Sequence, residues 1–326
     1  MTLQFLMPQY NETENIIKPL LDSIALQQQI DMNDIGVIIV NDGSNIKLTE
    51  NFLKSYSYKI EYYQNAHKGV SATRNACLDY ATADYVCWCD ADDMFYNMCG
   101  LWIVFNEIRN GGFDCLVSCF TEETRNPMTG EHVYINRDMD STFVHGKFYK
   151  RKYLIDKKIR FNDALTIHED SYFNILGQNC TKKAKYCPTP FYLWKWRDES
   201  VCRHDPLYMN KTYTNMLDSN TELVKQFLHR KMKDMAIFYS TMMFYDCYYA
   251  LNADRWWTKE GKPYVQKTEI RIQEYYKKFK YLIEQCPDMV KNQIIAGIKT
   301  RYTQEGVLFE KETFKAWFDR LLKDIK

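Results

Sequence analysis

Over roughly the first 200 residues, short apolar runs alternate with longer stretches in which apolar residues recur at helical spacing. The apolar runs are bounded by turn residues and predict strands at residues 3–7, 36–40, 59–63 and 85–89. Amphipathic spacing predicts helices at residues 14–26 and 71–80, with Ser71 in the position of an N-cap. Strands separated by helices of this length indicate βαβ units and a mostly parallel sheet.

Beyond Pro206 the pattern changes to long segments that are rich in Lys, Tyr and Met and carry few strand signals. These segments predict helices at residues 207–250, 264–286 and 288–325. We therefore expect two domains in this chain of 326 residues: an α/β domain over residues 1–205 and a smaller helical domain over residues 206–326.

Composition excludes some broad classes of protein. The formal net charge is +1, so no global field marks the whole chain as a nucleic-acid or membrane binder. Cys87 and Cys89 stand in an apolar run without a matching Cys/His pair, which favours buried free thiols over a zinc site. Without a signal peptide, and with no apolar run near the roughly 20 residues of a bilayer span, we expect a soluble protein with mostly free thiols in a reducing cytoplasm.

The segment Asp90-Ala91-Asp92-Asp93 carries the strongest chemical signal. It follows a run that predicts a buried strand, and three carboxylates in four positions repel each other unless a cation neutralises them. Hard oxygen ligands at this spacing suit Mg²⁺ or Mn²⁺, which typically bridge protein carboxylates to a diphosphate. A turn with helix-capping aspartates is the alternative for this tetrapeptide taken alone.

Two other polar segments also follow predicted strands. Pro8-Gln9-Tyr10-Asn11-Glu12 comes after the first strand, and Asn41-Asp42-Gly43-Ser44 comes after the second. In open α/β sheets, ligands bind beyond the carboxyl ends of the strands. Each segment alone is a weak signal, since Asn-Asp-Gly-Ser is a common turn, but their convergence on one edge of one sheet is what a nucleotide site needs.

Residues 67–75 and 167–173 complete the set. The first places a glycine and small residues before Arg74, which suits packing beside a nucleotide or, equally, a surface helix with a solvated arginine. The second places Glu169 and Asp170 before an apolar-aromatic helix, where the helix dipole favours negative charge. Simple N-terminal capping is the alternative there.

In their order along the chain, these five segments resemble the motifs of family 2 glycosyltransferases. Residues 144–149 resemble the segment that these enzymes place on the acceptor side, and residues 193–201 resemble a late aromatic-Arg-x-x-Ser element that closes over the diphosphate. The resemblance covers roughly the first 200 residues. It implies a GT-A fold (Rossmann-like, with a mostly parallel sheet), an inverting transfer, a nucleotide-sugar donor, and Mn²⁺ or Mg²⁺ as cofactor.

The resemblance also implies roles for individual residues. It assigns the nucleotide and the donor sugar to a set drawn from these segments: Pro8, Tyr10, Asn11, Glu12, Asp42, Arg74, Asp90, Arg197 and Ser200. Within that set, Asp42 would accept a hydrogen bond from a base, which is the ground for preferring uracil. Arg197 and Ser200 would steady the departing diphosphate.

The remaining roles concern the metal, the chemistry and the acceptor. Asp92 would ligate the metal, with His204 as a weaker candidate, and Asp93 would orient its neighbours or face the sugar. Asp170 would be the general base, supported by Glu169. Three residues would lie on the acceptor side: His145, Gly146 and Lys147.

The expected function is therefore metal-dependent transfer from a UDP-sugar to an acceptor hydroxyl, in which a UDP-α-sugar gives a β-linked product. Three acceptor classes remain open: a surface glycan, a polyol-phosphate polymer, and a hydroxymethylated base in DNA. The DNA acceptor would suit a phage-encoded enzyme in the host cytoplasm. A non-catalytic nucleotide-sugar or nucleic-acid binding module with the same fold is the alternative from another functional class.

The predicted helical domain has a mild excess of basic residues and would bind the acceptor or form a homo-oligomer. Residues 275–281 interleave aromatic and basic side chains, which could grip a polyanion while the rings stack on bases. At helical spacing the same segment reads as a core stripe of Tyr276, Phe279 and Ile283 with lysines on its solvated face.

Overall fold

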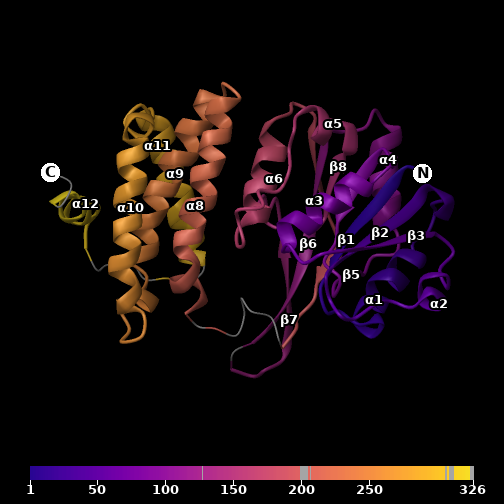
Figure 1. Cartoon of the computed structure of the whole chain (residues 1–326). Coiled ribbons are helices and arrows are strands. Elements are labelled where there is room, and N and C mark those ends of the chain that lie inside the picture. Colours follow the sequence, from indigo (N-terminus) through magenta and orange to yellow (C-terminus); the bar gives the residue numbers. More distant parts are fainter. Residues whose placement is uncertain (127, 199–204, 206, 305–306, 308–311, 324–326) are drawn as a thin grey trace. The chain divides into compact units, whose positions relative to one another are not determined.

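The computed structural model describes residues 1–126, 128–198, 205, 207–304, 307 and 312–323. The chain divides into two compact units, residues 1–198 and 199–326, the first built of strands and helices and the second helical in its described part (Figure 1). The expected domain boundary, at residue 205, lies a few residues after this division at residue 198. Acceptor binding or oligomer formation by the helical domain stays a prediction.

In the described part of the first unit, nine strands form one sheet in the order β3-β2-β1-β4-β8-β6-β9-β5, with β7 paired to β6. The strands are β1 (Leu3–Gln9), β2 (Ile35–Asp42), β3 (Lys59–Asn65), β4 (Tyr85–Trp88), β5 (Met94–Phe95), β6 (Cys115–Arg125), β7 (His132–Arg137), β8 (Lys147–Lys150) and β9 (Ala184–Trp194). Strands β3, β2, β1 and β4 are parallel neighbours, and β6 is parallel to β9. The mostly parallel α/β sheet of the GT-A class is thus confirmed. Strands β5, β7 and β8 pair antiparallel, which the sequence did not indicate.

The helices of this unit are α1 (Glu14–Ala25), α2 (Glu50–Leu53), α3 (Val70–Tyr80), α4 (Gly100–Arg109), α5 (Arg151–Asp156) and α6 (Glu169–Asn179). The prediction that Ser71 caps α3 is wrong. The helix begins one residue earlier, with Gly69 as its N-cap at φ 90°, a backbone conformation that glycine adopts without strain. The Ser71 hydroxyl lies within the helix and donates to the Leu165 carbonyl at 2.9 Å.

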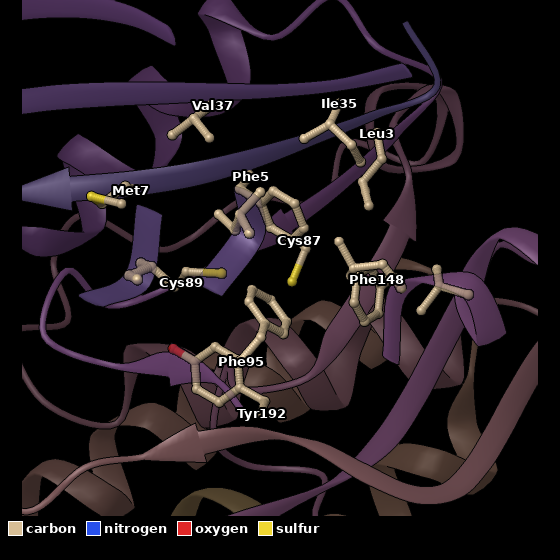
Figure 2. Packing of buried hydrophobic residues seen from close by; sticks show 14 of the residues in the cluster. Leu3, Phe5, Met7, Ile35, Val37, Cys87, Cys89, Phe95, Phe148 and Tyr192 are labelled. Atoms are coloured by element: carbon tan, nitrogen blue, oxygen red, sulfur yellow. The ribbon is translucent and has the colours of Figure 1, made fainter. Parts of the chain in front are cut away.

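A closely packed core supports the polar edge of the sheet. Leu3, Phe5 and Met7 alternate along β1 and are fully buried. Cys87 and Cys89 lie in the same cluster, as small apolar residues of the kind expected from their sequence context (Figure 2). Because these strands are held on both faces, the loops at their carboxyl ends start from fixed positions.

The second unit contains α8 (Tyr208–His229), α9 (Lys233–Leu251), α10 (Lys262–Ile283), α11 (Asp288–Gln304) and α12 (Phe314–Leu322). Helix α9 contacts α8, α10 and α11 (Figure 1). The predicted helix over 207–250 is interrupted near Lys231, which has φ 59°, and the one over 288–325 is two helices. Among the described helices, none combines the length and the apolar character that crossing a membrane requires.

The core-stripe interpretation of residues 275–281 is confirmed. Tyr276, Phe279 and Ile283 are buried, and Tyr275 is buried with them. Stacking of Tyr275, Tyr276 and Phe279 on bases is therefore wrong as an expectation, because these rings pack inside the helical unit, whereas Tyr281 is 51% exposed. The neighbouring lysines remain on the solvated face.

Candidate active site

A pocket of about 260 Å³ lies where β1, β2 and β4 reach their carboxyl ends. Parallel neighbouring strands end at the same edge of a sheet, so the three polar segments that follow them meet there. The pocket is lined by Pro8, Gln9, Tyr10, Glu12, Asp42, His67, Gly69, Val70, Thr73, Asp90, Ala91 and Asp92. The convergence expected from the sequence is therefore present in the structure.

The turn after β1 presents an aromatic ring and a carboxylate to this pocket. Tyr10 is 49% exposed, and its ring stacks on His67 with centroids 4.7 Å apart. Asn11 has φ 71°, and this tight turn lets the Tyr10 backbone N–H donate to Glu12 Oε2 at 2.6 Å. Burial raises the pKa of Glu12, and the nearby Asp92 charge adds to that effect.

Asp42 organises the loop that leads into α3. Its Oδ1 accepts the Lys68 backbone N–H at 2.8 Å and its Oδ2 accepts the Gly69 N–H at 2.9 Å. His67 Nδ1 lies 2.9 Å from the same Oδ2. A carboxylate offers roughly four acceptor positions, so a ligand N–H can still be bound while the loop is held.

Arg74 is buried beneath the pocket and links two carboxylates that are far apart in the sequence. Its Nη1 donates to Glu169 Oε1 at 2.6 Å, and its Nη2 donates to Asp90 Oδ1 at 3.0 Å. The side chain is only 6% exposed and lies over the Phe161 ring. Burial disfavours the charged guanidinium, but the carboxylates of Asp90, Glu169 and Asp170 outweigh it and raise the pKa of Arg74. The expectation of a solvated surface arginine is thus excluded.

Tyr192 fixes the loop that carries the three aspartates. Its hydroxyl donates to Asp93 Oδ2 at 2.7 Å and accepts the Asp90 backbone N–H at 3.2 Å. Asp93 Oδ1 accepts the Lys195 backbone N–H at 3.0 Å. Asp93 is fully buried, and burial together with the charges of Asp92 and Asp90 raises its pKa well above the usual range. Asp90 and Asp92 remain partly exposed and line the pocket.

His145 lies behind this loop. Its ring stacks on Tyr192 and on Trp194, with centroids 5.3 and 5.2 Å apart. Burial, with a contribution from the Lys147 charge, lowers the pKa of His145 to about 3, so the imidazole is neutral. Its Nδ1 lies 3.5 Å from Asp93 Oδ2 and makes no hydrogen bond within the described part of the chain.

Gly146 and Lys147 are also buried. Gly146 has φ 64°, and its carbonyl accepts the Ser118 backbone N–H at 3.0 Å. Lys147 Nζ lies 3.6 Å from Asp140 Oδ1, and burial lowers the pKa of this lysine. The three residues expected on the acceptor side therefore lie inside the fold in this structure, behind Asp93, because β8 is a central strand covered on both faces.

A divalent cation fits the chemistry of this loop. Asp90, Asp93 and His145 each offer one ligand atom, and these atoms lie within 4.8 Å of one another. Carboxylate oxygens and a neutral imidazole nitrogen are the donors that Mn²⁺ accepts, and Asp92 adds a carboxylate beside them. The unpartnered Nδ1 of His145 is a second sign that a polar ligand fits this place.

Asp92 also has a protein partner. Arg197 Nη1 donates to Asp92 Oδ2 at 2.9 Å, which brings the late aromatic-Arg segment to the edge of the pocket. Ser200 and His204, the other expected residues of that segment, lie outside the described residues.

Glu169 and Asp170 open helix α6, directly after His168 in a left-handed conformation at φ 62°. Glu169 is held by Arg74, whereas Asp170 accepts the Ser171 backbone N–H at 2.8 Å and keeps part of its surface exposed. Burial of most of the carboxyl, with the Glu169 charge beside it, raises the pKa of Asp170 to about 7. A carboxylate with this pKa can exchange a proton near neutral pH.

The structure thus joins the segments after three strands with Arg74, Arg197 and the start of α6. It also reveals contributions that the sequence did not indicate: His67 lines the pocket, and Tyr192 positions the aspartate loop. His67 belongs to the segment 67–75 that the sequence analysis singled out, but no role was assigned to it there. Tyr192 lies 99 residues from Asp93, so only the pairing of β9 with β5 identifies it.

Known proteins with similar sequences include glycosyltransferases. The sequence profile described as Glycosyl transferase family 2 matches residues 5–172. Glycosyltransferase GlyA of Streptococcus pneumoniae serotype 4 is 25% identical over 244 residues, 67% of this chain and 34% of that protein. The minor teichoic acid biosynthesis protein GgaB of Bacillus subtilis (strain 168) is 28% identical over 231 residues, 64% of this chain and 25% of that protein. The chain therefore spans about a third or less of these relatives.

Solved structures support the fold. Residues 1–349 of S. aureus TarS match with a TM-score of 0.61 at 16% identity, covering 94% of this chain and 92% of that one. The same TarS fragment has been solved with UDP-GlcNAc. The mannosyltransferase PcManGT of Pyrobaculum calidifontis, solved with GDP-Man and Mn²⁺, matches with a TM-score of 0.50 at 14% identity over 68% of this chain and 64% of that one.

Proposed function

Because the chain belongs to glycosyl transferase family 2, we propose that its first unit transfers a sugar from a nucleotide-sugar donor to an acceptor hydroxyl. The observation that carries the proposal is the pocket at the carboxyl ends of β1, β2 and β4, beside a carboxylate whose pKa is raised to about 7. A site for a base and a diphosphate next to a proton acceptor is what this reaction requires.

The donor is a UDP-sugar in this proposal. Tyr10 and His67 offer an aromatic face for the base, and Asp42 retains acceptor positions for a base N–H. The TarS structure with UDP-GlcNAc matches over 94% of this chain and supports a uridine donor, whereas PcManGT with GDP-Man matches over 68%. Arg74 is assigned to holding Asp90 and Glu169 in place and not to direct contact with the nucleotide, because its guanidinium is committed to these two carboxylates.

We assign Asp92 and Asp90 to holding Mn²⁺ or Mg²⁺, since both carboxylates line the pocket, whereas Asp93 and His145, which lie near Asp90, are buried and do not line it. Such an ion, when bound, neutralises the charge that grows on the departing diphosphate. Asp93 keeps the loop in shape, because Tyr192 and the Lys195 backbone already bind its two oxygens. Arg197 supplies a second positive charge for the leaving group from its position beside Asp92.

Asp170 takes the proton from the acceptor hydroxyl as the oxygen attacks the anomeric carbon. Glu169 and Arg74 orient and tune this carboxylate through their charges. A single base and no covalent sugar intermediate give inversion at the anomeric carbon, so a UDP-α-sugar yields a β-linked product.

For the acceptor we propose a polyol-phosphate polymer of the teichoic acid type, with a surface glycan as the second candidate. The support is the similarity to GgaB, whose name places it in minor teichoic acid biosynthesis. The helical unit would hold such a polyanion through the basic residues of its solvated faces, or would form an oligomer. We place the reaction in the cytoplasm.

A donor-release assay tests this function. The full chain is incubated with Mn²⁺ and UDP-, GDP- or TDP-sugars, alone and with a polyribitol phosphate, a neutral oligosaccharide or hydroxymethylpyrimidine DNA. We expect metal-dependent release from one UDP-sugar that polyribitol phosphate stimulates. Stimulation by the DNA would instead indicate a modified-base acceptor and would support a phage-encoded enzyme. No release from any donor by a folded, UDP-binding protein would favour a non-catalytic binding module.

Asp92→Asn provides a specific test of the metal assignment. We expect it to weaken UDP binding in Mn²⁺ by on the order of 10–100-fold, because an amide is a poorer ligand than a carboxylate. Calorimetric titration of UDP with Mn²⁺ and again with EDTA measures the effect. Asp79→Asn is the control, since Asp79 is exposed and pairs with Arg160. An Asp92→Asn protein whose UDP affinity still rises with Mn²⁺ as in the parent would remove Asp92 from the metal site.

A further inference from the structure

A second cavity lies on the strands next to the active-site loop. It has a volume of about 450 Å³, within the roughly 300–1,000 Å³ of small-molecule sites. Its walls are Tyr96, Thr121, Tyr134, Asn136 and Leu193, from the segment after β5 and from β6, β7 and β9. None of these residues lines the donor pocket.

The cavity opens on the opposite face of the sheet from His145. Thr121 pairs with Leu193 on β9 and with Asn136 on β7, so these three side chains share one face. Tyr192 and Trp194 flank Leu193 and therefore point to the other face, where they stack on His145. The cavity is thus a separate place in the first unit and not an extension of the aspartate loop.

Both tyrosines are held by their hydroxyl groups. The Tyr134 hydroxyl donates to Glu123 Oε1 at 3.0 Å, and the Tyr96 hydroxyl lies 2.9 Å from Thr121 Oγ1. Their side chains nevertheless remain 59% and 42% exposed. Since the hydroxyls are committed to protein partners, the exposed surface is ring surface in a fixed orientation, which costs little entropy when a ligand binds.

A hydrogen-bond chain orients the polar wall. Thr121 Oγ1 donates to Asn136 Oδ1 at 2.9 Å, and Tyr96 completes the chain behind it. The two N–H groups of Asn136 Nδ2 have no partner among the described residues, and the side chain is exposed. No charged side chain is among the five described lining residues. A neutral ligand with hydroxyl acceptors therefore fits better than an anion.

We propose that this cavity is a binding site for a neutral pyranose unit of a glycan, separate from the donor and acceptor hydroxyl sites. A pyranose has C–H groups on its ring faces and hydroxyls around its edge. The ring face would lie on the aromatic surface of Tyr134 or Tyr96, and an edge hydroxyl would accept from Asn136 Nδ2. The site holds a sugar that the polymer already carries and takes no part in the transfer.

Saturation-transfer NMR on the full chain tests this site. The probes are the methyl glycosides of glucose, galactose, mannose and N-acetylglucosamine, with excess UDP and Mg²⁺ present so that UDP occupies the donor pocket. We expect millimolar binding of at least one glycoside, weakened about tenfold or more by Tyr134→Ala and by Asn136→Asp. Asn136→Asp keeps the acceptor for Thr121 and removes both N–H donors. Tyr281→Ala, which alters an exposed tyrosine on α10, should leave binding unchanged.

Several results would overturn the site. Three results would each do so: no saturation transfer to any of the four glycosides, equal binding by the parent and both variants, or tighter binding of glycerol 3-phosphate than of every glycoside. The glycoside-binding assay requires no turnover, so its result can be interpreted even if the donor-release assay fails. The donor-release result can likewise be interpreted if no glycoside binds. Circular dichroism of Tyr134→Ala and Asn136→Asp checks that both variants keep the fold.

Discussion

Asp170→Asn is expected to lower the rate of sugar transfer by about 10²–10⁴-fold while UDP binding stays within about twofold of the parent. The amide keeps the shape of the side chain but cannot take the proton of the acceptor hydroxyl. Asp170 does not line the donor pocket, so the nucleotide site is left intact. Single-turnover transfer and a UDP titration measure the two effects. Asp156→Asn on α5 is the matched control, because Asp156 is exposed and pairs with Lys152 at the surface.

The pH dependence of the parent follows from the same carboxylate. A base must be deprotonated to act, and the pKa of Asp170 is raised to about 7. The rate should therefore rise with pH through about 7 and level off above it. A parent rate that is flat from pH 5 to pH 8, or an Asp170→Asn protein with near-normal turnover, would remove Asp170 from the role of base.

Thermal unfolding separates loss of chemistry from loss of fold. The pKa of Asp170 in the folded protein lies above the usual value of 3.8, so the folded state favours the protonated carboxyl. This group's contribution to stability is fully present below that usual value and is lost as the pH rises through about 7. At pH 8 the neutral asparagine should therefore give a melting temperature no lower than that of the parent.

The sequence predicts the edge of the site but not the contacts that shape it. Pro8, Asp42 and Asp90 follow apolar runs, and the rule that parallel strands end at a common edge brings them together before any coordinates are known. The partners of Asp42 are backbone N–H groups of residues 68 and 69, more than 25 residues away. Such contacts arise from the path of the loop, which local propensity does not encode.

The antiparallel part of the sheet was not predicted for a related reason. The whole of β7 is exposed, so it lacks the alternation of buried and exposed residues that identifies a strand in a sequence. Strand β9 carries two prolines, which weaken its signal further. Tyr192, the residues behind Asp93 and the second cavity all depend on this region. The sequence therefore indicated the segments that line the pocket more completely than the antiparallel strands that lie behind them.

In the helical unit, sequence spacing was a reliable guide to burial. Tyr276, Phe279 and Ile283 follow helical periodicity and are buried as that spacing requires. Three of the four aromatic residues interleaved with these lysines therefore lie on a packed helix face, and Tyr281 and the basic residues remain exposed. Periodicity decides which side chains face the core, but it does not say what the solvated face binds.

Arg74→Met is expected to destabilise the first unit by about 3–5 kcal/mol, because it leaves two carboxylates without their buried cation. Arg74 bridges Glu169 at 2.6 Å and Asp90 at 3.0 Å with a side chain that is 6% exposed. For a unit of this size the melting temperature should fall on the order of 10 °C. Arg160→Met is the matched control: Arg160 pairs with Asp79 at the surface, where loss of an ion pair typically costs about 1 kcal/mol or less.

Arg74→Lys distinguishes the charge from the two-pronged geometry. Lysine keeps the positive charge, but its single ammonium group cannot replace the two separate nitrogens that bind Glu169 and Asp90. We expect intermediate stability and a transfer rate below that of the parent, because the loop with Asp90 and the start of α6 are no longer held by one group. The Arg74 charge also lowers the pKa of Asp170, so in Arg74→Met the rise of rate with pH should move to higher pH, whereas in Arg74→Lys it should move less. If Arg74→Met unfolds no earlier than Arg160→Met and keeps the parent pH profile, the guanidinium neither supports the fold nor couples the donor loop to the base.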